Sequence, residues 1–139
     1  MASDVTASLV TLGDERFVSL TTFRRTGEPV STPVWVVRDG VALVVYTVAD
    51  SGKVRRIRRD GHVELRACDR RGRVADGTPV VAATAVVDES PETIDLTERL
   101  LRVKYGWEFG GVRLLQRAER IARRSATPRA RAVLRLTPM

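Results

Sequence analysis

Short strand-like segments joined by turn signals constrain the fold of this chain most strongly. Arg16–Phe23 is rich in Val, Leu, Thr and Phe, and Pro29–Val37 alternates apolar with polar or bulky positions. Val41–Val48 is apolar on both faces, as expected for a central strand. The dipeptide Asp39–Gly40 is a two-residue hairpin signal, so we expect Pro29–Val37 and Val41–Val48 to be antiparallel neighbours.

The remaining sequence adds further strands and a few helices. The periodicity predicts strands over His62–Asp69, Thr78–Val87 and Arg129–Thr137, and helices over 51–60, over Pro91–Lys104 and around Leu114–Ala122. Most strands are joined as hairpins, so the sheet should be antiparallel and should close into a small barrel with helices packed on its outside. We expect a mainly β (α+β) fold, and 139 residues suit a single domain over 1–139.

Charge and composition limit the kinds of partner that the protein can bind. The formal net charge is +7 and Lys53 and Lys104 are the only lysines among 24 basic residues, which favours an anionic partner: nucleic acid, an acidic membrane surface or a small molecule. No apolar run is long enough to span a membrane and no signal peptide is evident, so we expect a cytoplasmic protein with no membrane association. One cysteine, Cys68, and one histidine, His62, provide neither a disulfide nor a metal site.

The sharpest local feature is the segment Asp50-Ser51-Gly52-Lys53. It lies where a predicted strand runs into a helix N-terminus, with Ser51 placed as the N-cap. Free N–H groups, the helix dipole and the Lys53 charge would together bind a phosphate oxygen. The alternative interpretation is an ordinary capped helix with a surface lysine.

Five segments resemble one known superfamily. Arg16–Phe23, Gly27–Trp35, Thr47–Ile57, Cys68–Gly72 and Lys104–Trp107 are similar to the split β-barrel flavin and deazaflavin oxidoreductases, which include pyridoxamine 5'-phosphate oxidase-like proteins. The resemblance is strongest to the branch that uses coenzyme F420. It implies an FMN-binding-like split barrel, a homodimer, and a cofactor groove at the subunit interface.

The resemblance also implies which residues bind the cofactor. Four would run beside the ring system, five would hold the phosphate end, and one arginine would assist: Thr32, Pro33, Val34 and Trp35; Thr47, Ala49, Ser51, Gly52 and Lys53; and Arg58. Trp35 has a second interpretation as a buried core aromatic. No Ser/His/Asp arrangement is present, so we expect no catalytic side chain, and hydride transfer to or from a small organic substrate would belong to the cofactor.

The sequence is compatible with other cofactors and with other functions. The cofactor could be FMN or FAD instead of F420, although arginines at 55, 56, 58, 59, 70, 71 and 73 suit a long anionic ligand such as F420. The protein could instead carry a cofactor or tetrapyrrole without turnover. A nucleic-acid-binding module is the most distant alternative, because only 5% of residues are aromatic and no recognition motif accompanies the charge.

Overall fold

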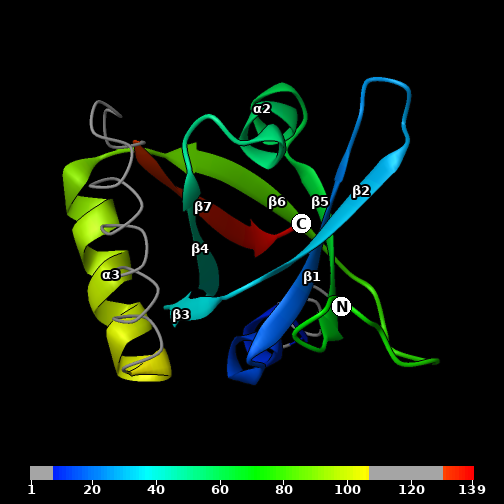
Figure 1. The fold of residues 1–139 in the computed structure, drawn as a ribbon, viewed down its shortest axis with the longest axis horizontal. Helices are drawn as coiled ribbons and strands as arrows, with labels where there is room; N and C mark the ends of the chain where they lie inside the picture. Colours follow the sequence, from blue (N-terminus) through cyan, green and yellow to red (C-terminus); the bar gives the residue numbers. More distant parts are fainter. Residues whose placement is uncertain (1–7, 107–129) are drawn as a thin grey trace, which may run out of the picture.

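The computed structural model describes residues 8–106 and 130–139. A single antiparallel sheet dominates the described residues, and it curls around one side of the core (Figure 1). Its strands are β1 (Phe17–Phe23), β2 (Pro29–Val34), β3 (Val37–Asp39), β4 (Ala42–Val48), β5 (His62–Cys68), β6 (Val81–Asp88) and β7 (Arg131–Pro138). The described helical elements include the 3₁₀ turn η1 (Leu12–Asp14) and the helices α2 (Gly52–Arg59) and α3 (Pro91–Tyr105).

The strand order explains why the barrel is split. The order is β2-β1-β5-β6-β7-β4-β3, so β2 and β3 form the two edges of the sheet. These edge strands are consecutive in the chain and are joined only by Trp35 and Val36. The chain therefore crosses from one edge of the curled sheet to the other across its open side, as the cyan segment in Figure 1 shows. The expectation of a mainly β split barrel is confirmed.

Because the chain crosses at Trp35 and Val36, the strand pairing differs in one respect from the pairing that the sequence predicts. The sequence predicts Pro29–Val37 as one strand beside Val41–Val48; the antiparallel pairing is present, but only Val37–Asp39 pairs with β4, while Pro29–Val34 pairs with β1. The β1–β2 hairpin closes at Gly27, whose φ of 90° suits glycine and whose N–H donates to the carbonyl of Arg24 at 2.8 Å. Proline lacks the N–H that a central strand needs for pairing on both sides. Pro29 and Pro33 are tolerated in β2 because it is an edge strand.

Two apolar clusters lie on opposite faces of the sheet. The larger fills the inside of the curl, and α2 contributes Val54 and Ile57 to it. The smaller lies under α3, where Leu101 and Tyr105 pack with strand residues including Val133. Full burial of such aliphatic side chains contributes about 1.5–3 kcal/mol each. The expected packing of helices on the outside therefore holds for α3, whereas α2 inserts its apolar face into the core.

The expected helix around Leu114–Ala122 lies outside the described residues. Within the described part of the chain, no helix combines the length and apolar character needed to cross a membrane.

Candidate functional site

The N-terminus of α2 has the geometry that the sequence predicts. β4 ends at Val48, and a short turn leads to Ser51, whose Oγ accepts a hydrogen bond from the N–H of Val54 at 3.4 Å. The first helical residues, Gly52 and Lys53, have no carbonyl partner for their N–H groups within the helix. No acidic residue occupies the first turn of α2, so the positive end of the helix dipole is not neutralised there.

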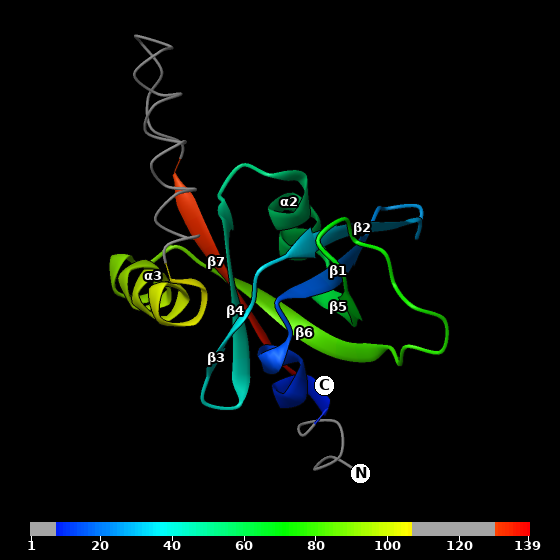
Figure 2. The same ribbon diagram turned by 60° about the horizontal axis from the view of Figure 1, so that its bottom comes forward.

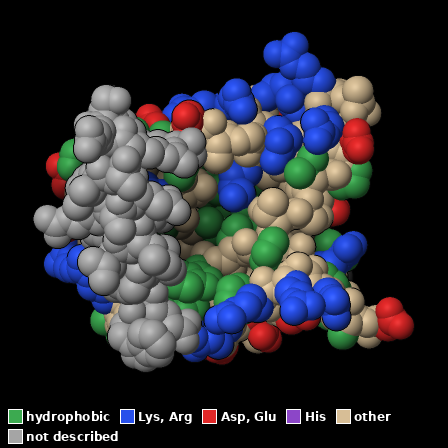
Figure 3. All heavy atoms as spheres, in the orientation of Figure 1, with side chains coloured by type: hydrophobic (Ala, Val, Ile, Leu, Met, Phe, Trp, Pro, Cys, Tyr) green, Lys and Arg blue, Asp and Glu red, His purple; other side chains and the backbone are tan. Residues whose placement is uncertain are grey.

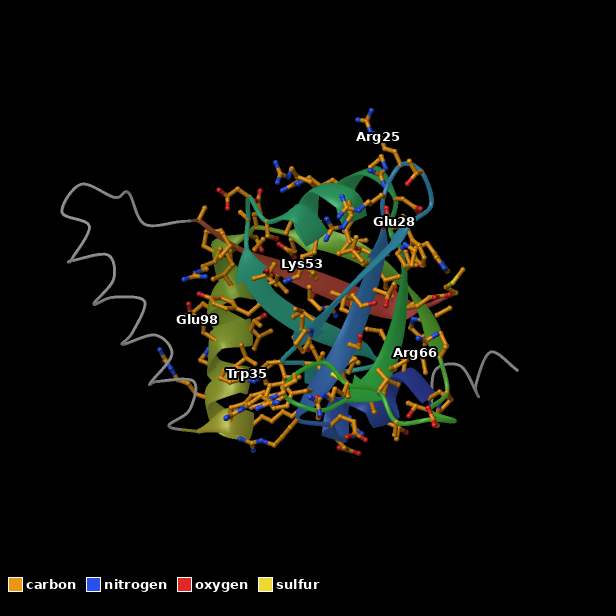
Figure 4. All side chains as sticks on the ribbon, turned by 45° about the vertical axis from the view of Figure 1, so that its right-hand side comes forward. Arg25, Glu28, Trp35, Lys53, Arg66 and Glu98 are labelled. Atoms are coloured by element: carbon orange, nitrogen blue, oxygen red, sulfur yellow. The ribbon has the colours of Figure 1, made fainter. Side chains whose placement is uncertain are left out.

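Lys53 is a half-buried cation beside this helix start. Among the described residues it has no hydrogen-bond or ion-pair partner. Burial lowers the pKa of Lys53, and the neighbouring positive charge of Arg56 lowers it further. Figure 4 shows Lys53 below α2, between β4 and the crossing chain of β2. A desolvated ammonium with no described counter-charge is what an anion-binding site requires before its ligand arrives.

Arg56 lies one helical turn after the helix start and joins Lys53 on the same side. Its Nε donates to Oγ1 of Thr22 at 2.6 Å, and Thr22 is buried in β1. A Cβ placed on Gly52 would lie 2.8 Å from Nη1 of Arg56, so the guanidinium lies directly against Gly52. The hydrogen bond to the buried Thr22 hydroxyl holds Arg56 against the barrel, so this arginine is only partly exposed. The i, i+3 spacing from Lys53 was the signal that could have found it.

The surface is hollowed on the side of the molecule where α2 lies. Figure 3 shows a depression below α2 with hydrophobic side chains at its base and Lys or Arg side chains along its upper side. Thr47 and Ala49, both expected at the phosphate end, lie on and just after β4. Thr47 is buried, while Ala49 packs against the inner cluster and donates its N–H to Ala130 O at 2.9 Å. Their side chains thus contribute to the wall and core beside the hollow.

The four expected ring contacts do not share one face of β2. Thr32 and Val34 point to the same side, and Val34 is buried in the inner cluster. Pro33 is exposed on the other side, where a Cβ on Gly72 would lie 3.3 Å from its Cδ. Figure 2 shows the β5–β6 connection passing beside the end of β2 at this place.

Trp35 packs against α3. Its ring stacks on Tyr105 with 4.5 Å between the ring centroids and 12° between the planes. It is half-buried and belongs to the periphery of the apolar cluster under α3. Figure 4 shows Trp35 beside the C-terminal end of α3, well separated from Lys53. Trp35 and Lys53 thus mark two ends of the region that β4 and the crossing chain border.

Arg58 is engaged elsewhere. Its Nη2 lies 3.1 Å from Oε2 of Glu89, and about half of the Arg58 side chain is exposed. The structure therefore brings Ser51, Gly52, Lys53 and Arg56 together, whereas Arg58 is paired away from them.

His62 and Cys68 form no second reactive site. The His62 ring stacks on Phe23 at 5.5 Å, and its Nε2 is 3.9 Å from Glu64. Cys68 is half-buried, and burial together with nearby Asp69 raises the pKa of its thiol, which keeps the thiol protonated and unreactive. Among the described residues, no group of His, Cys, Asp or Glu could hold a metal ion.

The curled sheet, its open side and the flanking helices define a split β-barrel of the flavin-binding type. Residues 7–139 match the pyridoxamine 5'-phosphate oxidase family, and this chain belongs to that family. No curated protein sequence matches the chain.

Solved structures share the fold at low sequence identity. A conserved hypothetical protein from Mycobacterium tuberculosis is 21% identical with a TM-score of 0.63, covering 93% of this chain and 77% of its own. An F420 reductase is 18% identical with a TM-score of 0.60, covering 93% of this chain and 91% of its own. HutZ, a heme storage protein from Vibrio cholerae, is 12% identical with a TM-score of 0.62, covering 99% of this chain and 87% of its own. Proteins with different named ligands thus share this fold.

Proposed function

We propose that this protein is an oxidoreductase that binds coenzyme F420, with its phosphate group at Ser51, Gly52, Lys53 and Arg56. The observation that carries the proposal is the pair of cations, Lys53 and Arg56, with no carboxylate in ion-pair contact among the described residues. A bound phosphate group would supply the missing counter-charge. Gly52 supports the fit, because its lack of a Cβ leaves room for the Arg56 guanidinium beside the helix N-terminus.

The ring system would lie along the crossing chain between this phosphate site and Trp35. β2 is an edge strand, so backbone N–H and C=O groups on its unpaired side are available to a ligand. Because Val34 serves the core and Pro33 faces the other way, we propose that the backbone of 32–35, rather than all four side chains, contacts the ring. A flat, conjugated ring could lie along this extended backbone, with the hydrophobic side chains of the depression beneath it.

Exposed arginines around α2 favour F420 over a shorter flavin. Arg55 and Arg59 are exposed on α2, and Arg24 and Arg25 lie exposed on the facing β1–β2 turn. Figure 3 shows Lys and Arg side chains gathered on this upper edge of the molecule. A ligand whose phosphodiester continues into an anionic tail would gain from these charges, whereas FMN would use only the inner pair.

The chemistry would come from the cofactor. A bound deazaflavin or flavin supplies hydride transfer at its ring. The chain's part would be to orient that ring, exclude water from one face and hold the phosphate, with no side chain taking part in the chemistry. The organic substrate would enter from the side of the ring that the crossing chain leaves open.

We also propose that two copies assemble as a homodimer, with the whole chain acting as one cofactor-binding domain. The outer face of β1 supports this. Its side chains Ser19 and Thr21 are small and polar, and the strands that α3 contacts most are β3, β4 and β7. Small side chains allow the backbone of a second copy to approach closely, as the self-complementary interface of a two-fold dimer requires.

A heme or tetrapyrrole carrier is the second candidate, and the heme-storage protein of the same fold favours it. The chain offers one histidine as an axial ligand. His62 alternates with the core residues Val63 and Leu65, so it lies on the face of β5 that points away from the inner cluster. That position favours the deazaflavin or flavin proposal over heme ligation.

Equilibrium binding separates these candidates. The purified protein is titrated with F420, FMN, FAD and hemin, and the dissociation constants are compared with those of a Lys53→Ala variant. We expect F420 to bind most tightly and the substitution to weaken it by about 1–3 kcal/mol, the range for a charge-assisted contact. Tight hemin binding that Lys53→Ala leaves unchanged would favour the carrier.

A further inference from the structure

The backbone of Val36 needs hydrogen-bond partners that the sheet cannot supply. Val36 lies between the last pair of β2 with β1 and the first pair of β3 with β4, so the described sheet gives it no strand partner. Val36 is nevertheless fully buried. A buried N–H or C=O without a partner costs about 1–3 kcal/mol, so the crossing requires another source of donors and acceptors.

The last turn of α3 supplies them. The N–H of Val36 donates to Oη of Tyr105 at 3.2 Å. The carbonyl of Val36 accepts from Nζ of Lys104 at 2.6 Å and lies 3.1 Å from the Tyr105 hydroxyl. Two neighbouring side chains of one helix thus replace the strand partners on both sides of the Val36 backbone.

The same two side chains attach two further segments. Nζ of Lys104 also donates to the carbonyls of Gly13 and Glu15, at 2.8 and 2.6 Å. The Tyr105 hydroxyl also donates to the carbonyl of Arg16 at 2.8 Å. Burial lowers the pKa of Lys104 to about 8, so at neutral pH the ammonium still carries the three protons that its three carbonyl partners use.

Tyr105 connects this network to Trp35 through its ring. The two rings stack at 4.5 Å, and Tyr105 itself is buried. The helix ends immediately afterwards at Gly106, whose φ of 60° places it in the region that favours glycine. The hydroxyl therefore fixes the backbone of the crossing, while the ring fixes the adjacent indole.

We propose that Lys104 and Tyr105 are positioning residues for the cofactor ring: they hold the crossing at Trp35 and Val36, and through it the ring-side wall, without touching the cofactor. This inference rests on the proposed function. It implies that α3, which is remote from the phosphate site, affects how the ring is bound and leaves phosphate binding unaffected.

The test uses Tyr105→Phe, which keeps the stacked ring and removes only the hydroxyl. Two readouts are used. Visible-region circular dichroism of bound F420 or FMN reports the environment of the ring. Inhibition of cofactor binding by inorganic phosphate reports the phosphate site at Lys53. Val103→Ala is the matched control, because Val103 lies in the same helical turn with 87% of its surface exposed. We expect Tyr105→Phe to alter the ring spectrum and weaken cofactor binding roughly ten-fold, with phosphate inhibition unchanged.

Three results would overturn the inference. In the first, Tyr105→Phe is less stable but binds F420 with the wild-type spectrum and affinity, which limits Tyr105 to folding and leaves the proposed function intact. In the second, ring binding and phosphate inhibition weaken together. In the third, the wild-type protein binds neither F420 nor FMN, which removes the proposed function as well.

A second variant covers a folding failure. If Tyr105→Phe does not fold, Lys104→Gln retains an N–H donor and leaves the Trp35–Tyr105 stack in place. The same change in ring spectrum with unchanged phosphate inhibition is expected for Lys104→Gln, and a wild-type spectrum would overturn the inference.

Discussion

Replacing Lys53 by Met should separate binding from folding stability. The ammonium of Lys53 is half-buried, its pKa is lowered by that burial and by the Arg56 charge, and no described residue pairs with it. The charge of Lys53 therefore does not contribute to the folding stability of the free protein. Methionine keeps the apolar stem, so we expect the free energy of unfolding to stay the same or to rise by up to about 1 kcal/mol.

Ligand binding should change in the opposite direction. A hydrogen bond between charged partners is worth about 1.5–3 kcal/mol, and about 1.4 kcal/mol corresponds to a factor of ten, so Lys53→Met should weaken F420 binding about 10- to 150-fold. The assay pairs urea unfolding of the free protein with fluorescence titration of F420. Arg102→Met is the matched control, because it removes an exposed cation from α3, away from the proposed site. It should weaken binding no more than about three-fold.

The reasoning would be refuted if Lys53→Met lowered the stability of the free protein and left the affinity for F420 unchanged. Lys53 would then serve the fold through its stem and charge, and the cation pair would not be an anion site.

Three further predictions follow from the same geometry. Gly52→Ala should fold normally but weaken F420 binding several-fold by displacing the Arg56 guanidinium, which lies 2.8 Å from the position of the new Cβ; a titration of folded Gly52→Ala with wild-type affinity would contradict this. Arg58→Gln should change the F420 affinity less than about two-fold, because Arg58 is exposed and paired with Glu89; a ten-fold loss would place Arg58 in the site after all. Because the pKa of Lys53 is lowered in the free protein and a bound anion favours its protonated form, F420 affinity should fall as pH rises through that lowered pKa, below the 10.5 of an ordinary lysine. Lys53→Met should lack this component of the pH dependence, and identical pH profiles for the two proteins would contradict it.

Much of the fold could be predicted from local pattern. The β-branched and aromatic composition of β1, the apolar character of β4 on both faces and the capped start of α2 at Ser51 are properties of neighbouring residues, so the sequence displays them directly. The break at Trp35 and Val36 could not be predicted in this way. The strand pattern of Pro29–Val37 continues through it, and only the curl of the whole sheet determines where the chain changes partner.

The site shows the same division. The place of Ser51, Gly52 and Lys53 at the start of α2 was predictable, because neighbouring residues in one helix turn determine it. The contact that places Arg56 beside Gly52 could not be predicted, because its partner, Thr22, is distant in sequence and buried in β1. The ion pair of Arg58, to which the resemblance assigns an assisting role, could not be predicted either, because helical spacing does not reveal Glu89 as its partner. Contacts between distant segments decided each of these differences.

Backbone amide NMR during a titration with F420 tests the central claim most directly. We predict saturable shifts, complete at one equivalent per chain, at the N–H groups of Gly52 and Lys53 and at the crossing residues Trp35 and Val36. Inorganic phosphate should reproduce only the shifts at Gly52 and Lys53. Shifts confined to the exposed arginines of α2, or an unchanged Lys53 amide at saturation, would contradict the proposed site.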